Sequence, residues 1–584
     1  MLDILFINTT EKNELRQEVN GTLILATKLL EAGFSADILR FYQMDSFLAE
    51  YEVFINEITD KIIKLEPKCI SFYTLWPYYH ILLRIAIEIK KRNSNIYVIF
   101  GGPQSSATAY ETMLAFDCVD YICTGEGENT VVPFFSSILK ENRKNIFQIP
   151  GLYYREKNEI KFNHIEVPLT ELNKIPHWDE RLINIEHDSK IKSDNYFFPI
   201  DAGRGCPFGC TFCCTSKLWK RNYRLKSPTT IISDIMYYNE KYGINSFSFS
   251  HDAFTVNKKI VSQLCDEIIN NKLDIAWMCT SRIDCVDEEL ILKMKKSGLK
   301  YIEFGIETGS SRMQKIINKR LDLTKVKGTI DFLIKNDIDI SLFFMYGFPD
   351  ETEQDLNETL EMVFTSWDSG VSKVRLAFCA FNANTEMTNK HINEMVFDSN
   401  IRILSRDIYG FNEEKEMFLK NKNIFPHFYH LSTPLRNEYQ YLFYLNSLYH
   451  NLPNTAKYVR KLYKGDNLKF YKDFYTNNVE FFKKEILHSK KIIRDNCVEL
   501  FNNTIKDFNE PYMKYIKALL KFDYNLQKVS HSDEDIYIKE KYNFNYLEYK
   551  MNIPIEEFSN TTTEILLEKN NGIFNMKIIS IDKC

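Results

Sequence analysis

Short apolar runs alternate with amphipathic stretches over two long blocks of this chain, residues 1–165 and 196–400. This alternation is typical of α/β domains, in which buried parallel strands are connected by helices that cover the sheet. Between the blocks, residues 166–195 contain two prolines from Val167 to Glu180 and show little periodicity, which is typical of a linker. The pattern therefore predicts two α/β domains that are joined by a linker.

The first block has glycine-rich turns directly after two of its predicted strands. Ile96–Phe100 runs into Gly101-Gly102-Pro103, and Asp120–Thr124 opens into Gly125-Glu126-Gly127-Glu128. At such strand ends the backbone can approach a ligand closely, and helix N-termini offer free N–H groups. We therefore expect a Rossmann-like domain that binds a ligand at the carboxyl edge of its sheet.

The second block carries six predicted strands that are separated by helical segments. They are Phe197–Asp201, Ser246–Ser250, Asp274–Thr280, Tyr301–Glu307, Ile338–Met345 and Lys373–Phe381. Repeated units of this kind indicate a (β/α) barrel or a partial barrel, in which the chemistry lies at the carboxyl ends of the strands. We expect a partial (β/α)6 barrel over residues 196–400.

The remainder, residues 401–584, is rich in Tyr, Phe, Lys and Asn and contains helical stretches such as Glu438–Tyr449 and Asn478–Ile493. We expect a mainly helical accessory domain that contributes substrate specificity. Its closing segment, Thr563–Ile581, is predicted to form two strands. The cationic and aromatic stretch Lys457–Lys491 either cradles a peptide or an acidic intermediate, or is a solvated helix face.

The composition excludes several classes of protein. With 44% hydrophobic and 26% charged residues the chain has the balance of a globular protein. A formal net charge of −5 gives no general attraction to nucleic acid. No apolar run approaches the roughly 18 residues of a membrane span, and the N-terminus has no pattern of an export signal. We therefore expect a cytoplasmic protein without a nucleic-acid or membrane partner.

Thirteen cysteines, an odd number, argue against a disulfide framework, and the densest group lies between Cys206 and Cys214. Cys206, Cys210 and Cys213 are spaced as Cys-x-x-x-Cys-x-x-Cys in a glycine-rich loop after a predicted strand. Three such thiolates can hold three corners of a four-iron, four-sulfur cluster and leave the fourth iron open. A zinc site is the alternative, but it would need a fourth ligand. Cys214 is expected to be a neighbouring thiol.

With Phe212 directly before the third cysteine, the loop resembles the signature Cys-x-x-x-Cys-x-aromatic-Cys of radical S-adenosylmethionine (SAM) enzymes. In that family the open iron binds SAM, and one electron from the cluster splits SAM into methionine and a 5′-deoxyadenosyl radical. The resemblance extends over roughly residues 196–390. It implies further SAM contacts from Asp252, Arg282, Glu307, Gly347 and Pro349.

The resemblance suggests a role for each of these side chains. The guanidinium of Arg282 suits the methionine carboxylate, and the carboxylate of Glu307 suits ribose hydroxyls or the amino group. For both, a structural ion pair at the barrel rim is the alternative. The family usually has two adjacent aspartates at the second strand end, and of these only Asp252 is present.

The glycine-rich motifs of the first block, together with Val119-Asp120-Tyr121-Ile122, resemble the cobalamin-binding domain found ahead of many radical SAM barrels. The resemblance covers most of residues 1–150. It implies cobalamin contacts from Gly101, Gly102, Pro103, Gly125, Glu126 and Gly127. No Asp-x-His-x-x-Gly motif is present, so the block offers no lower imidazole ligand of that kind.

Two features of this block leave alternatives open. Gln104 stands where the subgroup commonly has histidine, so a domain that keeps the fold without the cofactor is one alternative. For Glu126 and Glu128, the alternative is that they are solvated loop carboxylates.

Taken together, the resemblances imply an enzyme that uses a 4Fe-4S cluster, SAM and cobalamin to methylate an unactivated carbon of a peptide or natural-product substrate. A radical SAM cyclase, epimerase or rearrangement enzyme without methyl transfer is the alternative, and a cobalamin or iron-sulfur sensor is a third reading. An electron donor such as flavodoxin or ferredoxin is the implied protein partner. Cys497 and Cys584 are either auxiliary ligands or incidental thiols.

Overall fold

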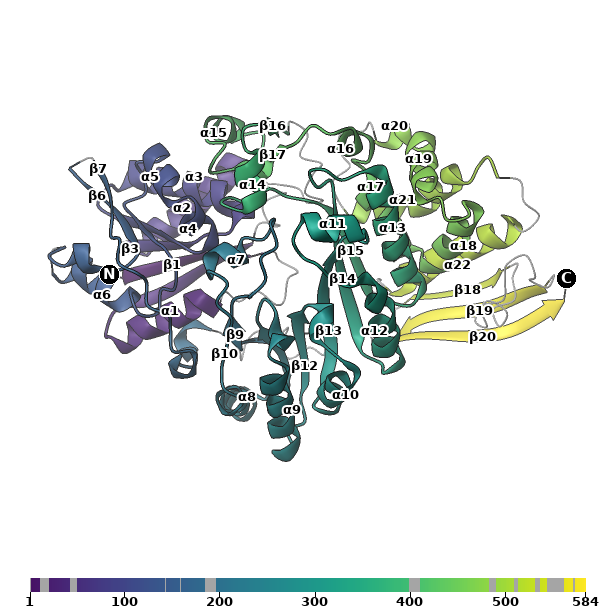
Figure 1. The fold of residues 1–584 in the computed structure, drawn as a ribbon, viewed down its shortest axis with the longest axis horizontal. Helices are drawn as coiled ribbons and strands as arrows, with labels where there is room; N and C mark the ends of the chain where they lie inside the picture. The colour runs from purple at the N-terminus through teal and green to yellow at the C-terminus, as the bar shows by residue number, and fades with distance from the viewer. Residues whose placement is uncertain are drawn as a thin grey trace.

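The computed structural model describes residues 2–10, 20–42, 50–141, 143–157, 159–183, 196–398, 410–482, 490–508, 513–530, 536–542, 561–570 and 573–583. An N-terminal α/β domain, a central parallel sheet with its helices and a C-terminal helical part follow one another along the longest axis of the molecule (Figure 1). The predicted fold class is confirmed.

The N-terminal domain is a seven-stranded sheet in the order β2-β1-β3-β4-β5-β6-β7. Its strands are β1 (Leu2–Thr10), β2 (Ala36–Tyr42), β3 (Pro67–Tyr73), β4 (Tyr97–Gly101), β5 (Tyr121–Cys123), β6 (Leu152–Glu156) and β7 (Glu159–Phe162). Strands β1 to β5 are parallel, and β6 and β7 are antiparallel. The carboxyl ends of β1, β3, β4 and β5 therefore meet at one edge.

Helices cover both faces of this sheet. They are α1 (Asn20–Glu31), α2 (Tyr51–Lys64), α3 (Tyr79–Arg92), α4 (Pro103–Ala107), α5 (Ala109–Ala115) and α6 (Val131–Leu139). Successive side chains of a strand point to opposite faces. Ile4 and Phe6 of β1 accordingly pack in one core with α1 and α6, whereas Leu5 and Ile7 pack in the other with α2 and α3.

The central sheet has six parallel strands in sequential order, with β8 and β15 at its edges, and is therefore a partial barrel. Its strands are β8 (Phe198–Asp201), β11 (Ser246–Ser250), β12 (Ala276–Ser281), β13 (Leu299–Glu307), β14 (Asp339–Tyr346) and β15 (Lys373–Phe378). All six predicted strands are present near their predicted bounds. A short antiparallel pair, β9 (Gly203–Arg204) and β10 (Arg224–Leu225), follows β8.

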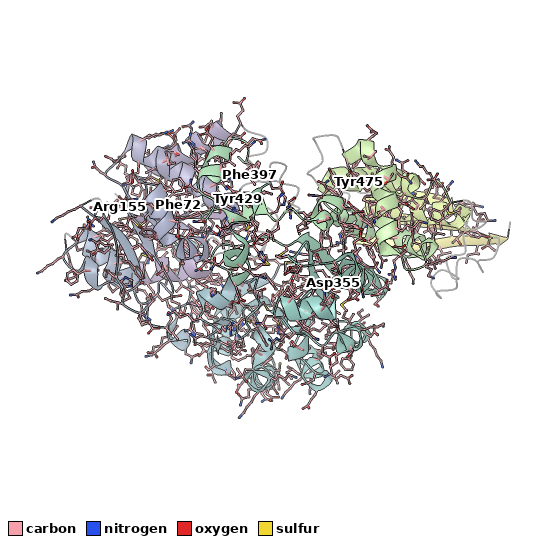
Figure 2. The ribbon with its side chains drawn as sticks, turned by 45° about the horizontal axis from the view of Figure 1, so that its top comes forward. Phe72, Arg155, Asp355, Phe397, Tyr429 and Tyr475 are labelled. Atoms are coloured by element: carbon pink, nitrogen blue, oxygen red, sulfur yellow. The ribbon has the colours of Figure 1, made fainter. Side chains whose placement is uncertain are left out.

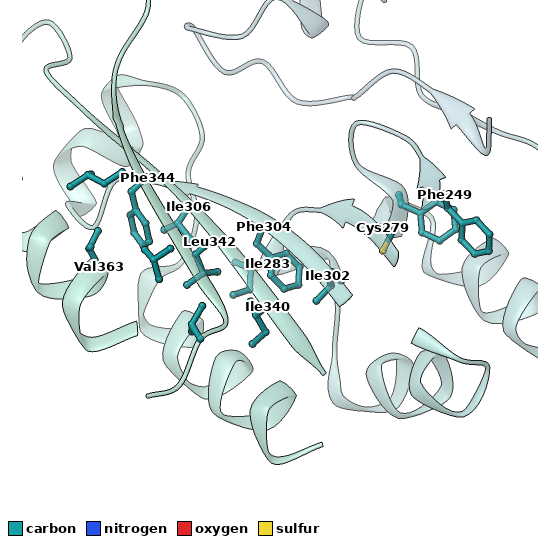
Figure 3. Close-up of a cluster of buried hydrophobic side chains, with 14 of the residues drawn as sticks. Phe249, Cys279, Ile283, Ile302, Phe304, Ile306, Ile340, Leu342, Phe344 and Val363 are labelled. Atoms are coloured by element: carbon teal, nitrogen blue, oxygen red, sulfur yellow. The ribbon is translucent and has the colours of Figure 1, made fainter. Parts of the chain in front are cut away.

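The helices of the barrel are α7 (Thr215–Leu218), α8 (Pro228–Tyr242), α9 (Lys258–Asn270), α10 (Glu288–Lys296), α11 (Ser311–Ile316), α12 (Leu323–Lys335), α13 (Glu353–Asp368) and α14 (Glu386–His391). Alternate apolar residues of β13 and β14 pack with α13 in one buried cluster (Figure 3). These include Phe304, Leu342, Phe344 and Val363. The strand residues between them face the opposite side, which is the interior of the partial barrel.

The C-terminal part contains α16 (Pro434–Glu438), α17 (Leu442–Asn451), α18 (Pro453–Leu462), α19 (Asn467–Asn477), α20 (Val479–Phe482), α21 (Lys490–Thr504) and α22 (Met513–Ser530). The predicted helix Glu438–Tyr449 matches α17. The predicted helix Asn478–Ile493 matches α20 and the start of α21, and residues 483–489 lie outside the described ranges. Within the predicted cationic stretch, Lys464 and Lys472 are exposed while Phe470 and Phe474 are buried, as in an amphipathic helix with a solvated face.

A three-stranded antiparallel sheet closes the chain. It consists of β18 (Ile536–Tyr542), β19 (Thr561–Asn570) and β20 (Ile573–Lys583). The two strands predicted for the closing segment are present as β19 and β20, and β18 adds a third that the sequence pattern did not reveal.

Residues 410–431 return to the N-terminal domain. This segment contains α15 (Lys415–Lys420), and its β17 (Tyr429–His430) pairs with β16 (Val396–Phe397). Phe418, Phe425 and Phe428 belong to the same buried cluster as α2 and α3. Figure 2 shows Phe397 and Tyr429 beside the N-terminal domain and far from Tyr475 of the helical part. The chain after the barrel thus covers the N-terminal domain before it builds the helical part.

Among the helices that the structure describes, none combines the length and the apolar character needed to span a lipid bilayer.

Candidate functional site

The cysteine loop lies at the carboxyl end of β8, between β9 and α7. Cys206, Cys210 and Cys213 are partly buried, and none of them forms a disulfide. Burial raises the pKa of the Cys206 thiol to about 11, and the thiols of Cys213 and Cys210 contribute to the rise. The three thiols are therefore close enough to interact electrostatically.

Two neighbouring segments hold the loop in place. The Thr211 N–H donates to the carbonyl of Ile317 at 3.0 Å, and Asn318 Nδ2 donates to the carbonyl of Gly209 at 2.8 Å. From the other side, the Thr211 carbonyl accepts the N–H of Met387 in α14 at 2.9 Å. The loop is thus fixed by chain segments that follow β13 and β15.

Three thiols on one short loop fit a four-iron cluster, since each thiolate would bind a different iron. In the described part of the chain, no three His, Cys, Asp or Glu side chains are grouped around the position of a single metal ion. Cys214 lies beside Cys213, and burial above all raises its pKa to about 11.

Arg282 follows β12 and lies beside the cysteine loop. Its guanidinium stacks over the Phe208 ring, with the central carbon 3.7 Å from the ring centroid. Nε and Nη2 donate to Asp284 at 3.0 and 2.8 Å, and Nη2 also donates to the carbonyl of Lys319 at 2.9 Å. Nη1 is buried and has no hydrogen-bond partner among the described residues. A buried donor without a partner fits a binding site for a carboxylate.

Glu307 ends β13, and its carboxylate accepts a hydrogen bond from Lys319 Nζ at 2.9 Å. Its φ of +72° is unusual for a residue with a side chain, and the strand register shifts between Gly305 and Glu307. Such strain is retained at sites where the surroundings impose it. Burial raises the pKa of Cys210, with Lys319 and Arg282 opposing the rise and Glu307 adding to it, so these groups surround one thiol.

Asp252 follows β11, and its side chain is exposed. Desolvation by the surrounding protein still raises its pKa, although hydrogen bonds from the Gly205 backbone and from Thr215 oppose the rise. The preceding His251 stands where the family usually has the first aspartate. Its Nδ1 accepts the N–H of Ala253 at 2.8 Å, and Nε2 lies 3.3 Å from the carbonyl of Arg224. Burial lowers the pKa of His251 to about 4, so this side chain is a neutral backbone contact.

The turn Gly347-Phe348-Pro349 follows β14. Gly347 has a φ of +78°, and a Cβ there would lie 2.8 Å from the Phe378 ring, so glycine is needed. The Glu351 carboxylate accepts the N–H groups of Gly347 and Phe348 at 2.5 and 3.3 Å. The Phe348 ring lies 6.0 Å from the ring of Phe212 in the cysteine loop. The structure thus brings the predicted aromatic residue to the predicted turn.

The strand ends of the N-terminal domain are closely packed. Gly102 has a φ of +102°, and a Cβ there would lie 3.0 Å from the N and O atoms of Thr74, which follows β3. Thr74 Oγ1 donates to the Gly101 carbonyl at 2.8 Å. Gln104 Nε2 donates to the carbonyl of Ile424 at 2.8 Å, so this side chain binds the returning segment 410–431.

The acidic pair after β5 is buried and faces the barrel. Glu126 and Glu128 are each 5% exposed. Glu128 forms an ion pair of 2.5 Å with Arg204, Glu126 pairs with Arg204 at 3.5 Å and with Arg224, and Arg204 also pairs with Asp201 at 3.1 Å. The interpretation of these carboxylates as solvated is therefore wrong, because the tertiary fold places two arginines against them.

The linker completes this cluster of buried charges. The Thr170 N–H donates to Glu126 at 2.7 Å, and its hydroxyl donates to Glu128 at 3.2 Å. The Thr170 carbonyl accepts a hydrogen bond from Arg224 at 3.0 Å. We call the group of Glu126, Glu128, Asp201, Arg204 and Arg224 the interdomain ion network. It joins the carboxyl edge of the first sheet to the residue that lies two positions before Cys206.

The two candidate sites are neighbours. Tyr73 ends β3 at the carboxyl edge of the N-terminal sheet and is partly buried, which raises its pKa to about 12. Asp252 and Cys214 contribute to the rise. Helix α4 of the N-terminal domain also contacts α7, which follows the cysteine loop. In Figure 1, α7 accordingly lies between the N-terminal domain and the barrel.

Sequence reasoning missed three residues of this region. Lys319 has no motif around it, and only the fold brings it to Glu307. Arg204 lies two positions before Cys206 and Arg224 eleven positions after Cys213, but the carboxylates that they pair with are distant in sequence. A requirement that every buried carboxylate have a cation could have suggested them only if burial had been known.

Comparison with known families agrees with this geometry. Residues 200–363 match the Radical SAM superfamily, and residues 14–134 match the B12 binding domain. The chain therefore carries a radical SAM domain and a B12-binding domain. A radical SAM domain implies a 4Fe-4S cluster and SAM, and a B12-binding domain implies cobalamin.

Among individual relatives, an uncharacterized methyltransferase of Pyrococcus horikoshii is 28% identical over 54% of this chain and 67% of its own length. The anaerobic magnesium-protoporphyrin IX monomethyl ester cyclase of Rubrivivax gelatinosus is 24% identical over 57% of this chain and 60% of its own length. The structure of the cobalamin-dependent SAM radical enzyme OxsB with aqua-cobalamin bound has the same fold, with a TM-score of 0.56 and 13% identity over 90% of this chain and 84% of OxsB.

Proposed function

We propose that this enzyme uses cobalamin and SAM to methylate an unactivated carbon of a peptide or of a small natural-product molecule. The observation that carries the proposal is the contact between the two candidate cofactor sites, in which Arg204, two positions before Cys206, pairs with Glu128 at 2.5 Å and with Glu126 at 3.5 Å after β5 of the first sheet. A methyl donor at the first edge and a radical source at the second would then act on one substrate. When bound, the cluster would supply an electron for SAM cleavage, and cobalamin would supply the methyl group.

The residues of the chain have distinct tasks in this proposal. Cys206, Cys210 and Cys213 hold the cluster and leave one iron open. Arg282, with its unpartnered buried Nη1, binds the carboxylate of SAM, and Glu307 binds its amino group or the ribose hydroxyls.

The backbone has tasks as well. Next to Phe212, the turn Gly347-Phe348-Pro349 exposes main chain to the adenine, and Asp252 completes the SAM site. At the carboxyl edge of the first sheet, Gly101-Gly102-Pro103 and Gly125-Glu126-Gly127 let the main chain approach cobalamin, because their glycines carry no side chain.

Metal and cofactor analysis tests the proposal without knowledge of the substrate. Anaerobically purified and reconstituted enzyme should contain about four irons and four sulfides per chain and should bind cobalamin. Cys210→Ala should lose most of the iron, whereas Cys214→Ala should keep it, since Cys214 stands outside the spacing. With SAM and a reductant, the wild type should release 5′-deoxyadenosine. A Cys210→Ala variant that still released it would refute the assignment.

A cyclase is the second candidate function, because a cyclase is among the relatives that match more than half of this chain. SAM with a deuterated methyl group separates the two. Methyl transfer would place the label in the product, whereas cyclisation would leave the product unlabelled and would still release 5′-deoxyadenosine.

A further inference from the structure

A cavity of about 270 Å³ opens on one side of the cysteine loop. Its lining residues include Gly209 and Cys210 of the cysteine loop and the cations Lys217, Lys220 and Arg221. The other two cysteines of the spacing do not line it, and neither do Arg282 and Glu307. The cavity therefore reaches Cys210 from a side other than the one proposed for SAM.

The wall of this cavity is strongly cationic. Lys217, Lys220 and Arg221 are all exposed, although the chain as a whole carries a net charge of −5. One carboxylate, Glu386, also lines the cavity and leaves an excess of positive charge. We call the three cations the basic rim.

Little of the charge of the basic rim is neutralised. Within the described residues, Lys217 and Arg221 form no ion pair, and Lys220 pairs with Glu166 at 3.3 Å in an arrangement where both side chains are more than 70% exposed. An exposed pair of this kind contributes little and is easily exchanged for another partner. The rim is therefore available to an anionic partner.

The backbone presents the rim in one defined turn. Lys220 and Arg221 have φ values of +49° and +58°, which side-chain-bearing residues seldom adopt. The turn is closed by hydrogen bonds from the N–H of Arg221 to the Ser216 carbonyl at 3.1 Å and from the N–H of Asn222 to the Trp219 carbonyl at 2.8 Å. The Arg221 guanidinium lies against Gly209, where a Cβ would collide with it. A cation is thereby held one residue from Cys210.

The chemistry of the cavity distinguishes a protein partner from a small substrate. Pockets for small molecules are mostly apolar and largely enclose their ligand, whereas this lining consists of a glycine, a cysteine, a serine and charged side chains. Exposed cations around an open hollow suit electrostatic steering of an acidic protein, and redox partners typically form small and transient interfaces.

We propose that the basic rim is the docking surface for an acidic, low-potential electron-transfer protein that reduces the cluster through Cys210. This inference rests on the proposed function, which places a cluster on Cys210. The step transfers one electron: the donor protein is oxidised by one electron, the cluster is reduced by one, and no bond forms or breaks in the protein.

The test compares two double variants with the same change in charge. Lys217→Glu combined with Lys220→Glu reverses the rim, and Lys325→Glu combined with Lys327→Glu reverses two exposed lysines of α12. Each reconstituted holoenzyme is mixed in stopped flow with a reduced acidic flavodoxin, and the loss of cluster absorbance is followed. The affinity of flavodoxin for each protein is measured separately by calorimetry.

We expect the rim variant to be reduced at least about 10-fold more slowly and to bind flavodoxin correspondingly more weakly. The α12 variant should stay within about 2-fold of the wild type, whose rate should fall as salt is added. Equal rates in rim variant and wild type, or equal losses in both variants, would overturn the inference.

Reduction by photoreduced deazaflavin, a small uncharged reductant, separates this inference from the proposed function. The rate at which deazaflavin reduces the cluster should be the same in the wild type, the rim variant and the α12 variant. If the protein holds no cluster that deazaflavin can reduce, the proposed function fails. If deazaflavin reduces every variant and flavodoxin does not discriminate between them, only the docking surface is wrong.

Discussion

At the residue scale, the protonation state of Glu351, a partly buried residue, affects the turn after β14. It accepts the N–H groups of Gly347 and Phe348, yet its Oε1 has no hydrogen-bond partner in the described structure. Burial raises its pKa to about 8 despite those two hydrogen bonds. The folded protein therefore keeps a proton on Glu351 at a pH where the unfolded chain has lost it.

This proton gives a testable pH dependence. Because the pKa is raised from 4.5 to about 8 on folding, stability should fall as pH rises through that window. Glu351→Gln keeps an oxygen acceptor for the turn and removes the titration. As pH rises from about 5 to about 8, the melting temperature of the variant should therefore increase relative to that of the wild type. Parallel curves for the two proteins would contradict the assignment.

Gly102 carries a second prediction at this scale. Alanine at 102 would suffer both the positive φ and a close approach to the Thr74 backbone, whereas alanine at Gly33 would suffer the positive φ alone, since nothing lies within 4 Å of its Cβ. We expect Gly33→Ala to cost about 1–2 kcal/mol and Gly102→Ala to cost more and to lower cobalamin binding. Urea unfolding and the cobalamin absorbance of the reconstituted protein measure the two effects. Normal cobalamin loading of Gly102→Ala would remove this turn from the proposed site.

At the scale of single elements, α13 begins with a capping box next to the same turn. Thr352 accepts the N–H of Asp355, and the Asp355 side chain accepts the N–H of Thr352 at 2.9 Å. Asp355, which is labelled in Figure 2, also pairs with Arg312 of α11. Burial opposes ionisation of Asp355, but hydrogen bonds from Arg312, Ser310 and Thr352 outweigh it and hold the pKa below its usual range. One cap therefore fixes two helices.

Loss of the cap should be measurable. We expect Thr352→Ala to destabilise the protein by about 1 kcal/mol, because it leaves a helix N–H without an acceptor, and Thr352→Ser to stay close to the wild type. Hydrogen exchange of the first turn of α13 is the appropriate measurement. Unchanged protection in Thr352→Ala would show that the cap adds nothing.

Helices and strands were also the features that the sequence predicted best. All six barrel strands were found from apolar runs, because each is buried between helices on one side and the barrel interior on the other. Strand β18 was missed because exposed and partly buried residues alternate along it and it contains several charged residues. It becomes a strand by pairing with β19.

At the scale of the whole molecule, the interdomain ion network holds the first domain against the barrel. Charge from Arg204 lowers the pKa of Glu128 below its usual value, although burial acts in the opposite direction. Removing one partner of a buried ion pair leaves the other charge without compensation. The network should therefore govern how firmly the two cofactor domains are joined.

We expect Arg204→Ala to cost about 3–5 kcal/mol at this interface, seen as faster hydrogen exchange in the linker residues 166–183 and around β5. Arg181→Ala, which removes an exposed pair with Asp179, should cost less than about 1 kcal/mol. Equal exchange in the two variants would mean that the network does not hold the domains together.

The sequence by itself determined which elements form and where the candidate site residues lie along them. Apolar periodicity, glycine turns and the cysteine spacing are local, so they predicted both α/β domains and the cysteine loop, and the family resemblance added Arg282 and Glu307. Only the tertiary structure decided the contacts between distant segments. It brought Lys319 to Glu307, and it buried Glu126 and Glu128 in ion pairs, which rules out the alternative of solvated carboxylates. It also placed residues 410–431 on the first domain. These contacts depend on burial and on partners that are far apart in sequence, and a local sequence pattern predicts neither of them.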